Sequence, residues 1–161
     1  MVCYTVHYRF SQSFPFPVED AFAWASDYDP GDIRLMGMDG TREIERIDED
    51  TIVLDDAFVT GGRTVRKRRL VRLFPELHAL TNTRLSGPNR HSQFIYQFVG
   101  EGENGSRLDF TGAQVNRADA VPSSAEVAAL AKAYATEDAA LWVNLAEAMN
   151  RDLGPRRRRG R

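Results

Sequence analysis

One long helical segment closes a chain that is otherwise patterned for antiparallel strands. Near the end of the chain, apolar residues recur every three or four positions, which is the spacing of one helix face. These residues are Val127, Leu130, Tyr134, Leu141, Leu145 and Met149. The pattern predicts a helix over 124–153, about 45 Å long at 1.5 Å per residue, which Gly154 and Pro155 should end.

Seven strands are predicted before that helix. Residues 2–14 alternate between apolar and polar side chains, as a strand with one buried face does. Turn signals such as Gly61-Gly62 and Asn104-Gly105 separate the other runs into hairpins. The other predicted strands are 42–48, 51–60, 63–74, 77–85, 91–99 and 107–115.

Two short helices are predicted between the first and second strands. Pro15 and Pro17 stop the first strand, because proline cannot donate to the ladder. Pro17 also suits a helix start, and Glu19 and Asp20 follow it in the first turn, where carboxylates are favoured. This helix is expected over 17–27, with a second helical piece at 33–36.

The segment FPFPVEDAFAWASD at 14–27 and the order of elements over 2–153 resemble the START/Bet v1-like superfamily, also called SRPBCC. The resemblance implies an α+β helix-grip fold. In this fold a curved seven-stranded antiparallel sheet surrounds a long C-terminal helix, with one or two short helices between strands 1 and 2. A ligand cavity is expected between sheet and helix. The superfamily includes polyketide cyclases, lipid carriers and chaperone cofactors, so the resemblance does not select one function.

The inward faces of these elements carry many rings, which either fill the core or border a cavity. We expect the cavity to be lined by nine residues. They are Asp56, Phe94, Tyr96, Phe98, Phe110, Tyr134, Asp138, Leu141 and Trp142.

Two acidic residues fall on predicted inward faces. Asp56 follows Ile52 and Leu54 at a period of two, so its carboxylate must be paired or must shift its pKa if it is buried. The alternative is that the strand turns outward there. Asp138 lies on the helix stripe and is expected either to meet a ligand or to form a salt bridge at the edge of the core.

The strand at 63–74 is strongly basic. Arg66, Arg68 and Arg72 share one side of it, and Lys67 and Arg69 share the other. One side is expected to meet acids of the neighbouring strands, such as Asp55 or Glu45. A solvated sheet face is the favoured interpretation, and an arginine inside the cavity is the alternative.

No residue pattern assigns a cofactor or a metal. Cys3 is the only cysteine, and His7, His78 and His91 are scattered, without metal-ligand spacing. No catalytic residue is assigned, although Asp56, Asp138, Tyr96 or His78 could move protons. The chain has neither a long apolar run nor a signal-peptide pattern, and we expect a cytoplasmic protein.

The chain is interpreted as one domain over 1–154 and a basic tail over 155–161. All 23 acidic residues precede the tail, which contains five arginines, so the acidic body argues against specific nucleic-acid binding. The tail is expected to be disordered, with weak contact to anionic membranes as a possible role.

The favoured function is binding or transport of a small hydrophobic molecule, without catalysis. The alternatives are a polyketide cyclase or aromatase, and a protein-interaction module such as a chaperone cofactor. The oligomeric state is left undetermined.

Overall fold

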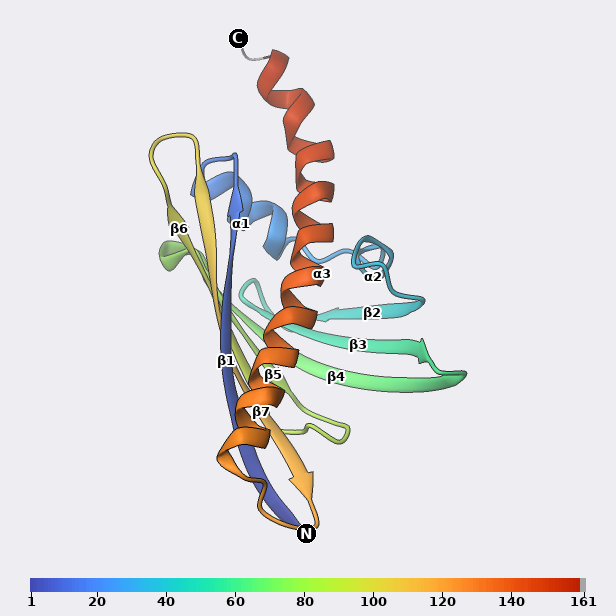
Figure 1. The fold of residues 1–161 in the computed structure, drawn as a ribbon. Coiled ribbons are helices and arrows are strands. Elements are labelled where there is room, and N and C mark those ends of the chain that lie inside the picture. Colours follow the sequence, from blue (N-terminus) through green and yellow to red (C-terminus); the bar gives the residue numbers. More distant parts are fainter. Residues whose placement is uncertain (160–161) are drawn as a thin grey trace.

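The structure is a computed structural model that describes residues 1–159. It confirms the predicted order of a strand, two short helices, six strands and a long helix (Figure 1). The helices are α1 (Val18–Ser26), α2 (Asp32–Leu35) and α3 (Ser124–Arg159), with a 3₁₀ turn, η1 (Pro75–Leu77). The strands are β1 (Val2–Phe14), β2 (Gly40–Arg46), β3 (Thr51–Thr60), β4 (Arg63–Phe74), β5 (Ala79–Arg84), β6 (Gln93–Gly100) and β7 (Ser106–Ala118).

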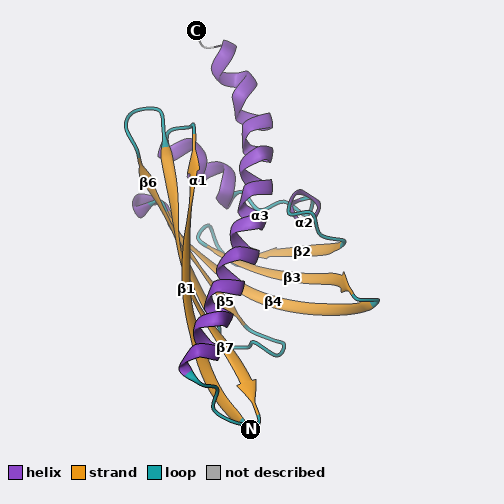
Figure 2. Cartoon of the chain, viewed as in Figure 1, coloured by secondary structure: helices purple, strands orange, loops and turns teal. Residues whose placement is uncertain are grey.

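All seven strands form one antiparallel sheet in the order β1-β7-β6-β5-β4-β3-β2. The first strand therefore pairs with the last, and the remaining strands follow as a meander. The sheet curves around α3, which lies across its inner face and contacts β1 (Figure 1). The two short helices lie beside the C-terminal half of α3 (Figure 2). This is the expected α+β helix-grip fold.

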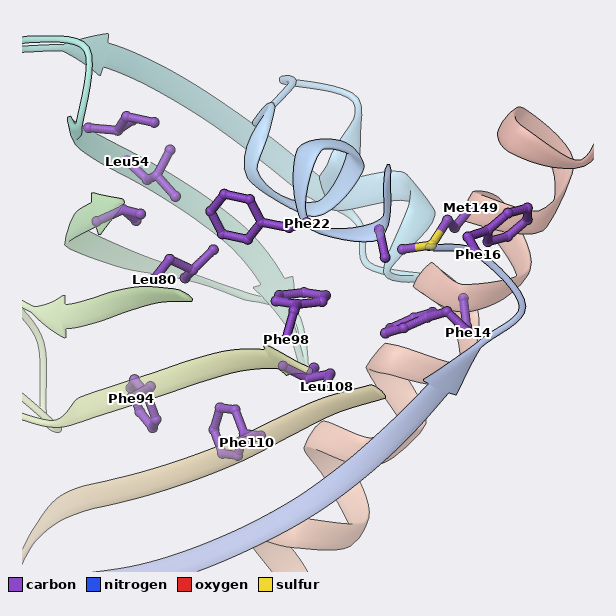
Figure 3. Packing of buried hydrophobic residues seen from close by; sticks show 14 of the residues in the cluster. Phe14, Phe16, Phe22, Leu54, Leu80, Phe94, Phe98, Leu108, Phe110 and Met149 are labelled. Atoms are coloured by element: carbon purple, nitrogen blue, oxygen red, sulfur yellow. The ribbon is translucent and has the colours of Figure 1, made fainter. Parts of the chain in front are cut away.

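The core fills one end of the space between sheet and helix. Figure 3 shows Phe22 of α1 pointing toward Phe98 of β6, and their ring centroids are 5.8 Å apart. Phe14 stacks on Phe98 from the other side at 6.0 Å, and Met149 of α3 is fully buried nearby. Because α1 covers this end, burial of apolar surface there stabilises the fold.

The end of α3 corrects one prediction. The helix continues through Pro155 to Arg159, so it does not end at Leu153. The expected disorder of the basic tail stays a prediction. Pro155 removes only one N–H donor in the last turns, and arginine favours helices and their C-terminal ends. Residues 160–161, and the side chains from 157 onward, lie outside the described part of the chain, so the expected membrane contact stays a prediction.

Apart from the end of α3, strand and helix boundaries differ from the predicted ones by at most three residues. The largest shift is in β7, which extends to Ala118 because it pairs with all thirteen residues of β1. No helix among the described residues has the length and apolar character needed to cross a bilayer.

Candidate functional site

A cavity of about 250 Å³ lies between the inner face of the sheet and the middle of α3. Its walls combine aromatic rings with charged and amide side chains. From the sheet they include Tyr8, Phe58, Lys67, Arg69, Arg84, Phe94, Tyr96, Phe110 and Gln114. From α3 they include Tyr134, Glu137, Asp138, Leu141, Trp142 and Leu145, and from the loops Met36, Met38 and Asn89.

Aromatic side chains form the apolar part of the cavity. Phe94 stacks on Phe110 at 5.9 Å between ring centroids, and Tyr96 meets Phe110 edge-on at 5.0 Å. Trp142 reaches down from α3 to within 5.9 Å of Tyr96. A smaller cavity of about 80 Å³ shares Tyr96 and Trp142 with the first. These rings hold one another in place, so they form a rigid surface for a flat apolar molecule.

Tyr8 connects the sheet to the helix inside the cavity. Its hydroxyl donates a hydrogen bond of 2.6 Å to Oδ2 of Asp138. The register places Gly112 directly opposite Tyr8, and a Cβ on Gly112 would lie 2.7 Å from Cε1 of the tyrosine ring. Only glycine at position 112 leaves space for the Tyr8 ring in the orientation that brings its hydroxyl to α3.

Burial shifts the acidity of both partners. It raises the pKa of Tyr8, and the charge of Asp138 raises it further. Burial also raises the pKa of the Asp138 carboxyl, although the Tyr8 hydrogen bond and the charge of Arg84 oppose that shift. A carboxyl with a raised pKa, placed in a cavity, is a candidate for giving or taking a proton.

Three cationic side chains lie on the opposite wall. Lys67 and Arg69 are half-buried on β4, whereas Arg66 and Arg68 between and beside them are exposed. Arg84 of β5 pairs directly with Arg69 in the ladder. The alternation predicted for the basic strand is thus confirmed, and the solvated face that was favoured for it holds only for Arg66, Arg68 and Arg72. Arg68 meets Glu45 and Asp55, each at 3.8 Å, as expected for that side.

Asp56 is buried, as its period-two position predicts, but it does not line the cavity. Its carboxylate accepts hydrogen bonds from Arg42 at 2.8 and 3.0 Å and from Arg69. Burial would raise its pKa, but these two arginines outweigh burial and hold the pKa below its usual value. The paired arginines enclose the carboxylate, so no face of it is left for a ligand.

Phe98 is the second predicted lining residue that the cavity does not include. It shares a strand face with Phe94 and Tyr96, but it lies nearer to α1, and Phe22 packs against it. The other seven predicted residues border the cavity. They are Phe94, Tyr96, Phe110, Tyr134, Asp138, Leu141 and Trp142.

The histidines lie away from this cavity. The ring of His78 packs edge-on against Phe22 at 5.8 Å, and His7 and His91 are exposed. Within the described part of the chain, no three His, Cys, Asp or Glu side chains are grouped so that they could hold a metal ion.

Sequence reasoning offered an arginine inside the cavity only as the alternative for the basic strand, and it missed the role of Tyr8. The alternation of β4 separates Lys67 and Arg69 from their neighbours, but periodicity alone does not say which set faces inward. Arg84 is the last residue of its strand, and no sequence pattern indicated that it faces the cavity. Asp138, the partner of Tyr8, lies 130 positions further along the chain, and a local sequence pattern cannot predict a contact over that separation.

Comparison with known proteins gives a fold but no close relative. No family model matches the chain, and no curated protein sequence matches it. The aromatase/cyclase ZhuI from Streptomyces sp. R1128 is similar in structure, with a TM-score of 0.68 and 16% identity over 98% of this chain and 97% of that one.

Two further solved structures are similar to the same degree. Norcoclaurine synthase from Thalictrum flavum, solved with dopamine and hydroxybenzaldehyde, has a TM-score of 0.67 and 14% identity over 91% of this chain and 87% of its own. Ara h 8.0201 has a TM-score of 0.65 and 16% identity over 89% of this chain and 99% of its own. At such identities the likeness establishes the architecture alone.

Proposed function

We propose that this chain, which has the helix-grip fold of the START/Bet v1-like superfamily, binds a small, largely apolar molecule in the cavity between the sheet and α3. The observation that carries the proposal is the cavity itself. Its volume of about 250 Å³ is just below the range of about 300–1,000 Å³ usual for ligand pockets. It is bordered by five aromatic rings of the sheet and by Tyr134 and Trp142 of α3.

A chain of this architecture that served only as a protein-interaction module would have no need of such a space. Core side chains normally interdigitate until few voids larger than a water molecule remain. Here the rings near α1 do so, whereas those under the middle of α3 leave a cavity with polar groups at its edge. That contrast supports a bound molecule as the partner.

Filling the cavity tests this proposal directly. Leu141 lines the cavity, and Leu141→Trp should occupy it and abolish binding of a neutral fluorescent naphthylamine probe. Val143 is two positions away on the same helix and is 47% exposed, so Val143→Trp is the matched control and should bind the probe normally. If both variants bind the probe as the wild-type protein does, the cavity is not the binding site.

A second candidate function is a cyclase-type enzyme, and the Tyr8–Asp138 pair is the observation that favours it. In that case the Asp138 carboxylate would take a proton from the carbon between two carbonyl groups of the substrate. The cationic wall would stabilise the enolate that forms. The test follows hydrogen–deuterium exchange at that carbon of a simple aromatic β-diketone by NMR. Exchange that is no faster with wild-type protein than with Asp138→Asn would reject the enzyme.

A further inference from the structure

Lys67 does not form an ion pair with Asp56, the acidic residue opposite it in the sheet. In the ladder, Lys67 of β4 is the direct partner of Asp56 of β3. The Asp56 carboxylate, however, is taken by Arg42 and Arg69. Among the described residues, no carboxylate lies within ion-pair distance of the Lys67 ammonium. Its Nζ lies over the ring of Phe58 instead, 5.3 Å from the ring centroid.

Arg84, on the neighbouring strand β5, also lacks a counter-ion within the described part of the chain. Its guanidinium lies over the ring of Phe94 at 5.5 Å, and its buried Nε has no hydrogen-bond partner among the described residues. It also faces Arg69 directly across the ladder, where two like charges destabilise a sheet. Burial and the neighbouring charge of Arg69 lower the pKa of Arg84 accordingly.

Two cations are therefore brought together on one cavity wall without a counter-ion in contact. Removing a charge from water is costly unless it is paired, and a buried N–H without an acceptor adds to that cost. Asp138 lies on α3 and already accepts the Tyr8 hydrogen bond, and Glu137 is exposed. These two carboxylates offset the positive charge only across the cavity.

From this arrangement we propose that the ligand is an organic acid, whose single anionic group binds Lys67 and Arg84 while its rings pack against Phe94, Phe110 and Trp142. This inference rests on the proposed function, since it concerns the same cavity. An anion at this wall supplies the acceptor that Nε of Arg84 lacks and the charge that Asp56 does not give to Lys67. Charge-assisted hydrogen bonds of this kind are the stronger class.

A pair of fluorescent probes tests the inference. Anilinonaphthalene sulfonate and N-phenyl-naphthylamine share their ring system, and only the first carries an anionic group. The wild-type protein should bind the sulfonate about tenfold more tightly or better, because hydrogen bonds to charged groups contribute that much in a buried site. Lys67→Met and Arg84→Met should each remove most of this preference and leave affinity for the neutral probe within about twofold.

Arg66→Met is the control, because Arg66 lies next to Lys67 on the same strand but is exposed on the outer side. It makes the same change in net charge and should leave both affinities unchanged. Binding of the neutral probe also reports that each variant is folded. Equal affinity of the wild-type protein for the two probes would overturn the inference and leave the proposed function standing. Binding of neither probe would overturn both.

Discussion

The hydroxyl of Tyr8 donates a 2.6 Å hydrogen bond to Asp138 and so joins the first strand to the middle of the last helix. Both residues line the cavity, so the bond ties α3 to β1 beside it.

Loss of the hydrogen bond between Tyr8 and Asp138 should lower the stability of the protein measurably. Tyr8→Phe keeps the ring that packs on Phe110 but leaves the Asp138 carboxylate without its donor, so the free energy of unfolding should fall by about 1–3 kcal/mol. Urea denaturation at neutral pH measures the change. Tyr4→Phe on the same strand is the control, since no hydrogen bond of the Tyr4 hydroxyl is present among the described residues, and it should cost less than about 0.5 kcal/mol. Equal effects of the two changes would contradict this role of the bond.

The buried Asp56 and its exposed neighbour Asp55 should respond very differently to the same substitution. Asp56→Asn leaves Arg69 without a counter-charge and leaves the buried Arg42 with only Asp32, at 3.4 Å, and should cost about 3–5 kcal/mol. Asp55→Asn breaks only a 3.8 Å contact with Arg68, in which both side chains are about half exposed, and should cost less than about 1 kcal/mol. Chemical denaturation of both variants makes the comparison. A small loss in Asp56→Asn would show that Arg42 and Arg69 find other partners.

Binding of the anionic probe should weaken as the pH rises through 8. Burial, with the charges of Arg84 and Arg69, lowers the pKa of Lys67 to about 8, so the side chain loses its charge on the alkaline side of that value. Asp56 of β3 and Asp138 of α3 also act on Lys67, and Lys67→Met keeps all four of these groups.

The measurement is a titration of affinity for the anilinonaphthalene sulfonate between pH 6.5 and 9.5, where the sulfonate itself stays charged. The wild-type protein should lose affinity over this range, and Lys67→Met should show a flat profile. A decline of the same size in the variant would assign the effect to another group.

Replacement of Asp27 should stabilise the protein above pH 6. Asp27 is largely exposed, but partial desolvation first, and then the neighbouring carboxylates of Asp32, Asp29 and Asp152, raise its pKa from 3.8 to about 6. Between these two values the folded state binds more protons than the unfolded state, so this group makes stability fall as the pH rises. Asp27→Asn should therefore raise the melting temperature at pH 7.5 and leave it nearly unchanged at pH 3.5.

Thermal unfolding of wild-type protein and variant at the two pH values checks the sign. Asp20, in the first turn of α1, is the control because it is not one of the carboxylates that act on Asp27, and Asp20→Asn should have no such pH-dependent effect. A gain for Asp27→Asn that is equal at both pH values would mean that charge repulsion at Asp27 is not its cause.

The local patterns of the sequence determined the elements and their order. Alternation in β1 and the three- to four-residue spacing in α3 report which side of each element is apolar, because side-chain direction repeats with the geometry of the backbone. The same periodicity placed Phe94, Tyr96 and Asp138 on inward faces. Among the elements, the largest error was the end of α3, because the helix continues past Pro155.

Tertiary structure alone decided which inward residues meet a cavity and which are covered. Phe98 and Phe94 have the same strand face, yet α1 packs over Phe98 and leaves Phe94 bordering the cavity. Asp56 and Lys67 are opposite one another in the sheet, yet Arg42 from another strand takes the carboxylate. Both outcomes depend on contacts between residues distant in the chain, and a periodic pattern carries information about the direction of a side chain but none about its partner.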